Sequence, residues 1–280
     1  MFSCGRWKLV LFSRVRFWKS CRQTWRPLPI ATLGSATLFA SGALSSCVGC
    51  DATAERTERV VPLSTAWTSP RIKASGPVHP VVFIHGLDSW KGTWKSTVEE
   101  LSDKGVPSLA VDLRGHGESP LGVAEEFGVA QLAADVRAAV TAAGLLDTGG
   151  RVVLVGHSMG GRVAMRYAAD FPTDIAALVI EDMDCVPREK DVDAEKERRG
   201  KTFSRSFPTW DACREELLTY GYDAPRVDGW LQDGRAVRVP SGCWSMINPR
   251  AQHLAILTVL NSTDGTRSML RVAGARGLGV

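Results

Sequence analysis

The segment from Arg151 to Gly160 constrains the fold of this chain more than any other stretch. Its first half, R-V-V-L-V, has the length and apolar character of a buried strand, and G-H-S-M-G follows at once, before a helix-compatible stretch. A sharp turn from strand to helix exposes a serine well, and Gly156 and Gly160 allow the turn because neither carries a Cβ that would clash. The pattern therefore predicts that Ser158 is presented at a strained reversal of the chain.

The length of the chain allows one substantial folded domain. It has 280 residues, of which 44% are hydrophobic, and we find no internal repeat. Positive charge is concentrated at one end, since seven lysines and arginines lie between Arg6 and Arg26 and the first acidic residue is Asp51. Removing those seven charges from the overall +4 leaves the remainder at about −3. The basic character belongs to the N-terminus, so no nucleic-acid partner is expected.

Residues 1–50 resemble a targeting leader, and residues 51–76 read as a polar linker. The leader is basic, contains serine, has no acidic residue, and includes an uncharged, moderately apolar stretch over residues 28–48. These features are typical of mitochondrial or plastid transit peptides, and we favour mitochondrial import. A secretory signal or a membrane anchor through the apolar stretch is the alternative.

The cysteines do not indicate a disulfide framework. Four of the seven lie in the leader, and Cys185, Cys213 and Cys243 are widely spaced. Cys47 and Cys50 have the spacing of a redox or metal motif, but no second pair accompanies them. The cysteines therefore give no indication of a metal site, and we expect none.

Residues 77–184 alternate between apolar strands and helices. The expected strands are Val81–Ile84, Pro107–Leu113, Arg151–Val155 and Ile175–Ile180, with another near Val60–Trp67, and the expected helices are Thr93–Lys104, Ala124–Ala143 and 158–169. Strands of continuous apolar residues joined by helices predict a mostly parallel sheet with helices on both faces, which is an α/β fold.

Residues 185–272 differ from this core. A dense charge run over Pro187–Lys201 is typical of a solvated excursion. Helix-like segments follow at Thr209–Tyr220, Ala224–Gln232 and Pro249–Leu260, and the aromatic residues among them, such as Phe207, Trp230 and Trp244, show no strand rhythm. We expect a helical lid over the carboxyl ends of the strands, where open α/β sheets bind ligands. The alternative is that these aromatic residues only pack small helices together. Residues 273–280 are expected to be an irregular tail.

Three motifs occur in the order and spacing of a known superfamily. They are His85-Gly86-Leu87, the segment Asp112–Ser119, and the segment Gly156–Gly161. Over roughly residues 80–271 the chain resembles the α/β-hydrolases, and within them the small acyl esterases of the bacterial YbfF type and the mitochondrial abhydrolase-domain type. This resemblance implies the α/β-hydrolase fold and a hydrolase of carboxylic esters or thioesters that needs no cofactor.

The resemblance also assigns chemical roles. Ser158 would attack an acyl carbonyl and form an acyl-enzyme, which water then resolves. The negative oxygen that develops would be bound by the backbone N–H groups of Leu87 and Met159, which need no reorganisation during the reaction. The substrate would then be a small acyl ester or thioester.

The acid and the base of such a site are less well defined by the sequence. Asp182 ends an expected strand at the distance from Ser158 that the resemblance implies, with Glu181 and Asp184 as close competitors. The base of the superfamily is a histidine after the last strand, and the only histidine after the serine here is His253. Its helical, apolar context favours a core or lid position. The last strands and their histidine are therefore expected to be missing from this sequence.

A core without its last strands would expose an apolar edge at Leu178-Val179-Ile180. Such edges invite pairing with another chain or aggregation. We therefore expect either a partner or a missing segment to cover the edge near Val179, and we favour the missing segment. The function expected from the sequence is an acyl hydrolase acting through Ser158. The alternative is a catalytically inactive protein of the same fold that binds a small ligand or a partner.

Overall fold

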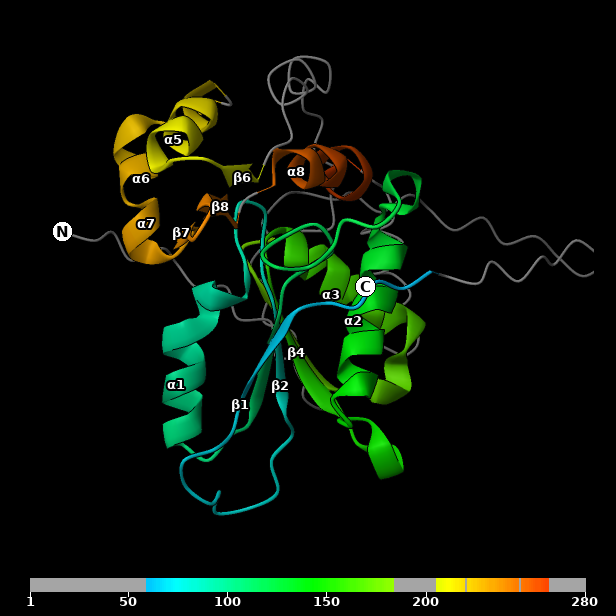
Figure 1. Cartoon of the computed structure of the whole chain (residues 1–280). Helices are drawn as coiled ribbons and strands as arrows, with labels where there is room; N and C mark the ends of the chain where they lie inside the picture. Colours follow the sequence, from blue (N-terminus) through cyan, green and yellow to red (C-terminus); the bar gives the residue numbers. More distant parts are fainter. Residues whose placement is uncertain (1–58, 184–204, 220, 247, 262–280) are drawn as a thin grey trace, which may run out of the picture. The chain divides into compact units, whose positions relative to one another are not determined.

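The computed structural model describes residues 59–183, 205–219, 221–246 and 248–261, which all belong to one compact unit. The expected leader, the charge run, the tail and Asp184 lie outside the described residues. None of the described helices is long and apolar enough to cross a membrane. A central sheet of five strands has the order β1-β3-β2-β4-β5 (Figure 1). Only β1 runs antiparallel to its neighbour, so the expected mostly parallel sheet is confirmed.

Helices cover both faces of this sheet, as expected. The strands are β1 (Thr65–Thr68), β2 (Val81–Ile84), β3 (Ser108–Val111), β4 (Val152–His157) and β5 (Ile175–Glu181). Helix α1 (Lys95–Asp103) lies on one face, and α2 (Val129–Ala142) and α3 (Met159–Asp170) lie on the other (Figure 1). Short 3-10 turns occur at Lys91–Trp94, Ala124–Glu126, Asp147–Gly149 and Pro172–Asp174.

The alternation of side chains along β2 explains the two layers. Val82 and Ile84 belong to the large apolar core under α2 and α3, whereas Val81 and Phe83 pack with Trp94 on the α1 side. Successive side chains of a strand point to opposite faces of its sheet, so a strand covered on both sides is apolar throughout. The continuous apolar runs in the sequence are the result.

Helix α2 begins later than the sequence pattern predicts. The expected helix spans Ala124–Ala143, but Ala124–Glu126 is a separate 3-10 turn and Gly128 is extended, with φ of −168°. The N–H of Leu132 donates to the carbonyl oxygen of Gly128, which closes the first turn of the helix. Apolar periodicity alone does not mark this boundary, because Phe127 and Val129 are both buried.

The region expected to form a helical lid contains helices and, besides them, three short strands that the sequence pattern did not indicate. Its helices are α5 (Trp210–Thr219), α6 (Ala224–Asp228), α7 (Trp230–Asp233) and α8 (Pro249–Ala255), and α8 continues as a π-helical turn over Ile256–Leu260. Three antiparallel strands, β6 (Ser206–Phe207), β7 (Ala236–Val239) and β8 (Gly242–Ser245), form a second sheet in the order β6-β8-β7. Strands of two to four residues are too short to show a clear alternation, and β6 pairs with β8 across a long stretch of chain.

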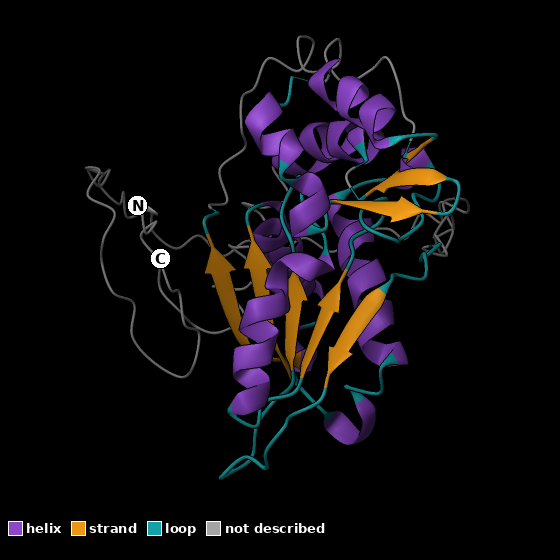
Figure 2. Ribbon diagram, turned by 60° about the vertical axis from the view of Figure 1, so that its left-hand side comes forward, coloured by secondary structure: helices purple, strands orange, loops and turns teal. Residues whose placement is uncertain are grey.

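Residues 205–246, which we call the lid segment, have a small core of their own. Trp230 and Cys213 are fully buried there, together with Cys243 of β8. Figure 2 shows these elements beyond the carboxyl ends of the parallel strands. Helix α8 and its π-helical turn instead pack into the main core, and buried Arg162 of α3 donates to the carbonyl oxygens of Val259 and Leu260 at 3.1 and 2.9 Å.

Candidate active site

Ser158 stands at the turn between β4 and α3. Its φ of 49° and ψ of −121° lie where residues other than glycine are rarely found. The flanking glycines leave no space for a side chain. A Cβ on Gly156 would lie 2.4 Å from the carbonyl oxygen of Gly160, and one on Gly160 would lie 2.4 Å from the carbonyl oxygens of Ile84 and His85. The sharp strand-to-helix turn is therefore present, and it leaves Ser158 partly exposed.

Backbone hydrogen bonds fix this turn to the next strand. The N–H of Ser158 donates to the carbonyl oxygen of Glu181 at the end of β5, at 2.9 Å. The N–H of Gly161 donates to the carbonyl oxygen of Ser158 at 2.8 Å. Met159 is the first residue of α3, and the first N–H groups of a helix have no acceptor within it. Such N–H groups at a helix N-terminus favour an anion.

The loop after β2 passes directly beside the serine. A Cβ on Gly86 would lie 3.0 Å from the Cβ of Ser158. Nε2 of His85 accepts the N–H of Leu113 at 3.0 Å, so Nδ1 carries the proton and donates to the carbonyl oxygen of Gly86 at 2.8 Å. Burial holds the pKa of His85 well below its usual range, so the ring is neutral. The peptide whose N–H belongs to Leu87 is thus held by a buried, neutral imidazole.

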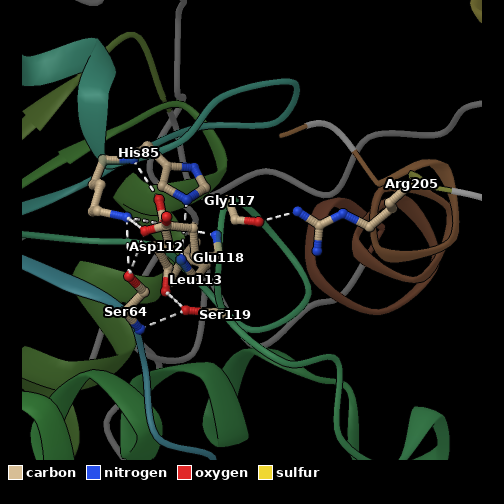
Figure 3. A network of polar contacts seen from close by, with 9 residues as sticks. Ser64, His85, Asp112, Leu113, Gly117, Glu118, Ser119 and Arg205 are labelled. Carbon is tan, nitrogen blue, oxygen red and sulfur yellow. Dashed lines mark hydrogen bonds and ion pairs between the residues drawn. The ribbon is translucent and has the colours of Figure 1, made fainter. Parts of the chain in front are cut away.

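A buried carboxylate ties this region to the loop after β3 (Figure 3). Asp112 is fully buried and accepts the backbone N–H of Lys91 at 2.6 Å, the Nζ of Lys91 at 2.7 Å and the N–H of Glu118 at 2.9 Å. Its carbonyl oxygen accepts the hydroxyl of Ser119 at 2.8 Å, and that hydroxyl accepts the N–H of Ser64 at 2.8 Å. Three segments of the chain therefore meet at this carboxylate, namely the loop after β3 and the segments around Ser64 and Lys91.

Gly117 connects this network to the lid segment. Its carbonyl oxygen accepts a hydrogen bond from Nη2 of Arg205 (Figure 3). Its N–H donates to the carbonyl oxygen of Met246 at 3.0 Å. The φ of Gly117 is 51°, and a Cβ there would lie 2.1 Å from the carboxyl group of Asp112. Burial lowers the pKa of Arg205 to about 10, and its guanidinium also lies 4.7 Å from the ring centre of Trp244.

The family of the chain follows from a comparison with family models. Residues 79–216 match the model described as the alpha/beta hydrolase fold. This chain belongs to the α/β-hydrolase superfamily. It is 36% identical over 124 residues to the putative carbamate hydrolase RutD of Escherichia coli O6:H1 (strain CFT073), which is 43% of this chain and 42% of that relative. The chain thus spans less than half the length of the curated relatives it matches.

Solved structures agree on the fold of this α/β-hydrolase. A marine microorganism esterase superposes with a TM-score of 0.55 and 22% identity, over 72% of this chain and 76% of the esterase. The structure of E-2-(acetamidomethylene)succinate hydrolase superposes with a TM-score of 0.51 and 22% identity, over 72% of this chain and 70% of that chain. At this level of identity the likeness shows the fold alone.

The expected acid of the α/β-hydrolase lies one residue beyond β5. Asp182 is exposed and has φ of 49°, and it makes no hydrogen bond or ion pair with another described residue. Glu181, its competitor, is half-buried, and its carbonyl oxygen is the acceptor for the N–H of Ser158. Asp182 therefore directly follows the strand that neighbours the serine turn, and its role as an acid stays a prediction.

The five histidines of this α/β-hydrolase are all described, and none hydrogen-bonds to the Oγ of Ser158. His85 and His116 are buried with ring centres 5.2 Å apart, and burial lowers the pKa of both. His253 is half-buried on α8, and the ring of His157 lies against the loop after β2. Among the described residues no group of three or more His, Cys, Asp or Glu is arranged to hold a metal ion.

An apolar groove of about 270 Å³ lies on the α1 side of the sheet. Its walls come from β2, β4, β5 and α1 and include Val155, Val179 and Glu181, whereas Ser158 is not among them. Within the described residues β5 has no strand partner on its outer side. The expected apolar edge near Val179 is therefore present in this part of the chain, and what covers it stays a prediction.

Two residues beside the site were not singled out from the sequence. Asp88 follows Leu87 and has a left-handed φ of 57°. The hydroxyl of Tyr222, from the lid segment, lies 2.8 Å from its carboxylate. The sequence carries no local signal for this contact, because the two residues are 134 positions apart.

Proposed function

We propose that this protein is a serine hydrolase of carboxylic esters or thioesters that forms an acyl-enzyme on Ser158. The observation that carries the proposal is the backbone of Ser158, a partly exposed serine held at φ of 49° between a buried strand and a helix. Holding a non-glycine residue in such a conformation costs on the order of 1–3 kcal/mol. Members of this superfamily accept that cost at the nucleophile, because the turn exposes its hydroxyl to substrate.

The neighbouring backbone supports binding of the oxyanion. Met159 begins α3, and the loop of Leu87 passes within contact distance of the serine through Gly86. Two peptide N–H groups from different segments would then converge on the oxygen that becomes negative when Ser158 attacks. Peptide donors fixed before the reaction stabilise that charge without reorganising.

We assign Asp182 as the acid, because it directly follows β5, whose last residue, Glu181, holds the Ser158 turn through its carbonyl oxygen. Its exposed carboxylate would orient a base and stabilise the cation that forms on it. A proton acceptor for Ser158 is the component that the described residues do not supply through a hydrogen bond. This observation favours a second candidate, an inactive α/β-hydrolase-fold protein that binds a small ligand or partner, since loss of a base lowers the rate by orders of magnitude.

Reaction with a fluorophosphonate probe separates the two candidates. Labelling of the wild-type protein that is lost in Ser158→Ala is the expected result for the hydrolase. Ser96→Ala is the matched control, because Ser96 is exposed on α1 and its loss should leave labelling unchanged. Absence of labelling in a folded wild-type protein would favour the inactive binding protein.

The class of acyl group is open to a direct assay. A panel of short and medium acyl esters, the matching thioesters and a carbamate presents the same electrophilic carbonyl with different leaving groups. The carbamate is included because RutD is named as a putative carbamate hydrolase. We expect turnover of esters or thioesters, and turnover confined to the carbamate would move this protein to another substrate class.

A further inference from the structure

The lid segment contacts the loop after β2 at Asp88, the residue that follows Leu87. Asp88 has φ of 57°, in the left-handed region that few residues other than glycine adopt. Its side chain is half-buried, and it contacts the lid segment through Tyr222. A strained residue persists only where surrounding contacts fix it.

Those contacts come from Tyr222 and Arg226. The Oη of Tyr222 lies 2.8 Å from Oδ1 of Asp88, and Nη2 of Arg226 lies 3.9 Å from Oδ2. Tyr222 is buried, and its ring packs edge-on against Trp230 at 5.2 Å within the core of the lid segment. The carboxylate of Asp88 is therefore bound by a residue whose own position is set by packing.

The protons available at Tyr222 determine the direction of these bonds. Its hydroxyl also lies 2.7 Å from Oε1 of Gln252, which is fully buried on α8, so the hydroxyl faces two acceptors. A phenol has one proton, and an ionised carboxylate can only accept. With the side-chain amide of Gln252 turned so that its NH2 group faces the phenol, Tyr222 donates to Asp88 and accepts from Gln252. Tyr222 then joins the loop, the lid segment and the main core.

The Leu87 N–H is restrained from its other side by His85. The carbonyl oxygen of Gly86 accepts a hydrogen bond from Nδ1 of His85 at 2.8 Å. This carbonyl and the N–H of Leu87 belong to one planar peptide, so their directions are fixed together. The hydrogen bond from His85 fixes the plane of the Gly86–Leu87 peptide, and the contacts of Asp88 fix the backbone that follows Leu87.

We propose that Tyr222 is a positioning residue which, through Asp88, holds the Leu87 N–H in the direction that an oxyanion requires. The catalytic part of this inference rests on the proposed function, whereas the restraint of the loop by Tyr222 does not. An N–H that must reorient during the reaction stabilises the oxyanion less. Loss of the hydroxyl should therefore lower kcat more than it changes KM.

Tyr222→Phe tests the proposal because it removes one hydroxyl and keeps the ring. We expect hydrogen–deuterium exchange of the amides at residues 87–90 to become roughly tenfold faster, and kcat to fall roughly tenfold with KM within about twofold. Tyr167→Phe is the matched control, since it removes another buried hydroxyl, which bonds Asp174 at 3.3 Å in the main core. It should change neither the exchange at residues 87–90 nor kcat.

Variants of Asp88 test the same contact from the loop. Asp88→Asn keeps an oxygen that accepts from Tyr222 and should retain most of the protection, whereas Asp88→Ala should match Tyr222→Phe. The double variant should be no worse than either single variant. Unchanged exchange in both Tyr222→Phe and Asp88→Ala would overturn the restraint, and faster exchange with unchanged kcat would overturn its catalytic role. A wild-type protein without turnover would count against the proposed function, and the exchange result would still decide the restraint.

Discussion

The two turns that meet beside Ser158 are held in opposite ways. In the turn after β4, close packing of backbone leaves no space for a Cβ on Gly156 or Gly160. In the loop after β2, buried side chains hold the backbone through hydrogen bonds, from His85 directly and from Asp112 through Lys91. The first turn is fixed by close backbone packing, both within the turn and against the end of β2, and the second by hydrogen bonds from buried side chains.

This difference predicts how each turn responds to substitution. Packing against backbone atoms cannot relax without moving a strand or a helix, so one added methyl group should have a large effect. When one member of a hydrogen-bonded network is removed, the loss in the protein's stability depends on how deeply that member is buried and how fully it is paired. The substitutions below are ordered by the size of the effect that this contrast predicts.

Gly160→Ala should be the most damaging single substitution. Its methyl group would lie 2.4 Å from two carbonyl oxygens at the end of β2, and neither can move independently of the sheet. We expect a loss of at least about 3 kcal/mol in the free energy of unfolding, measured by urea denaturation. Gly128→Ala is the control, because nothing lies within 4 Å of a Cβ there and its φ is an ordinary −168°. Similar losses in the two variants would show that close packing does not fix the turn.

Asp112→Ala should cost about 3 kcal/mol, because it leaves the partly buried ammonium of Lys91 without its buried partner and removes the acceptor for two backbone N–H groups. Asp103→Ala is the matched control. Asp103 also forms an ion pair, with Arg71 at 2.7 Å, but both side chains are more than half exposed. Its loss should change the free energy of unfolding far less than the loss of Asp112, because solvent screens an exposed pair. Equal losses in the two variants would contradict a special role for the buried carboxylate.

The turn around Ser158 could be predicted because its determinants are contiguous. A strand, two glycines and a helix start lie within one short segment, and the apolar runs of β2 to β5 likewise carry their own signal. The antiparallel sheet of the lid segment was missed because Ser206 pairs with Trp244 and neither strand is long enough to show a period. Local sequence therefore specified the main sheet, the serine turn and the helices of the lid, but not the lid strands.

The network around the second turn could not be predicted for the same reason. The bond from Leu113 to His85 spans 28 residues, and the bond from Tyr222 to Asp88 spans 134. His85 belongs to a motif that is visible in the sequence, but its tautomer follows only once its two partners are known. Chemistry that depends on such contacts becomes visible when the fold brings distant residues together.

The neutral state of His85 predicts how stability depends on pH. Burial, followed by the charge of His116, lowers the pKa of His85 in the folded protein. The unfolded chain therefore binds a proton near its ordinary pKa of about 6.5 while the folded protein does not, so stability falls as the pH drops below about 6.5. The slope should approach about 1.4 kcal/mol per pH unit for this one group.

Comparison with His85→Gln isolates that contribution. The variant should be less stable at pH 7, because Leu113 loses a well-placed acceptor. Its free energy of unfolding should also fall less steeply between pH 6.5 and pH 5. The slope should be smaller by up to about 1.4 kcal/mol per pH unit, which corresponds to the uptake of one proton. Urea denaturation at several pH values measures both effects. Parallel curves for the two proteins would show that His85 does not remain neutral in the folded state.

Glu118→Gln should have the smallest effect and marks the outer limit of the network. Hydrogen bonding and attraction to Lys91 lower the pKa of Glu118, but its side chain is 58% exposed, so solvent screens the pair. We expect a loss of about 0.5 kcal/mol near pH 7. Because the folded-state pKa is the lower one, this contribution is complete above the unfolded pKa of about 4.3 and disappears as the pH falls through the folded value. The difference between wild type and variant should therefore shrink on acidification, and a difference as large as that of Asp112→Ala would show that burial does not set the strength of these contacts.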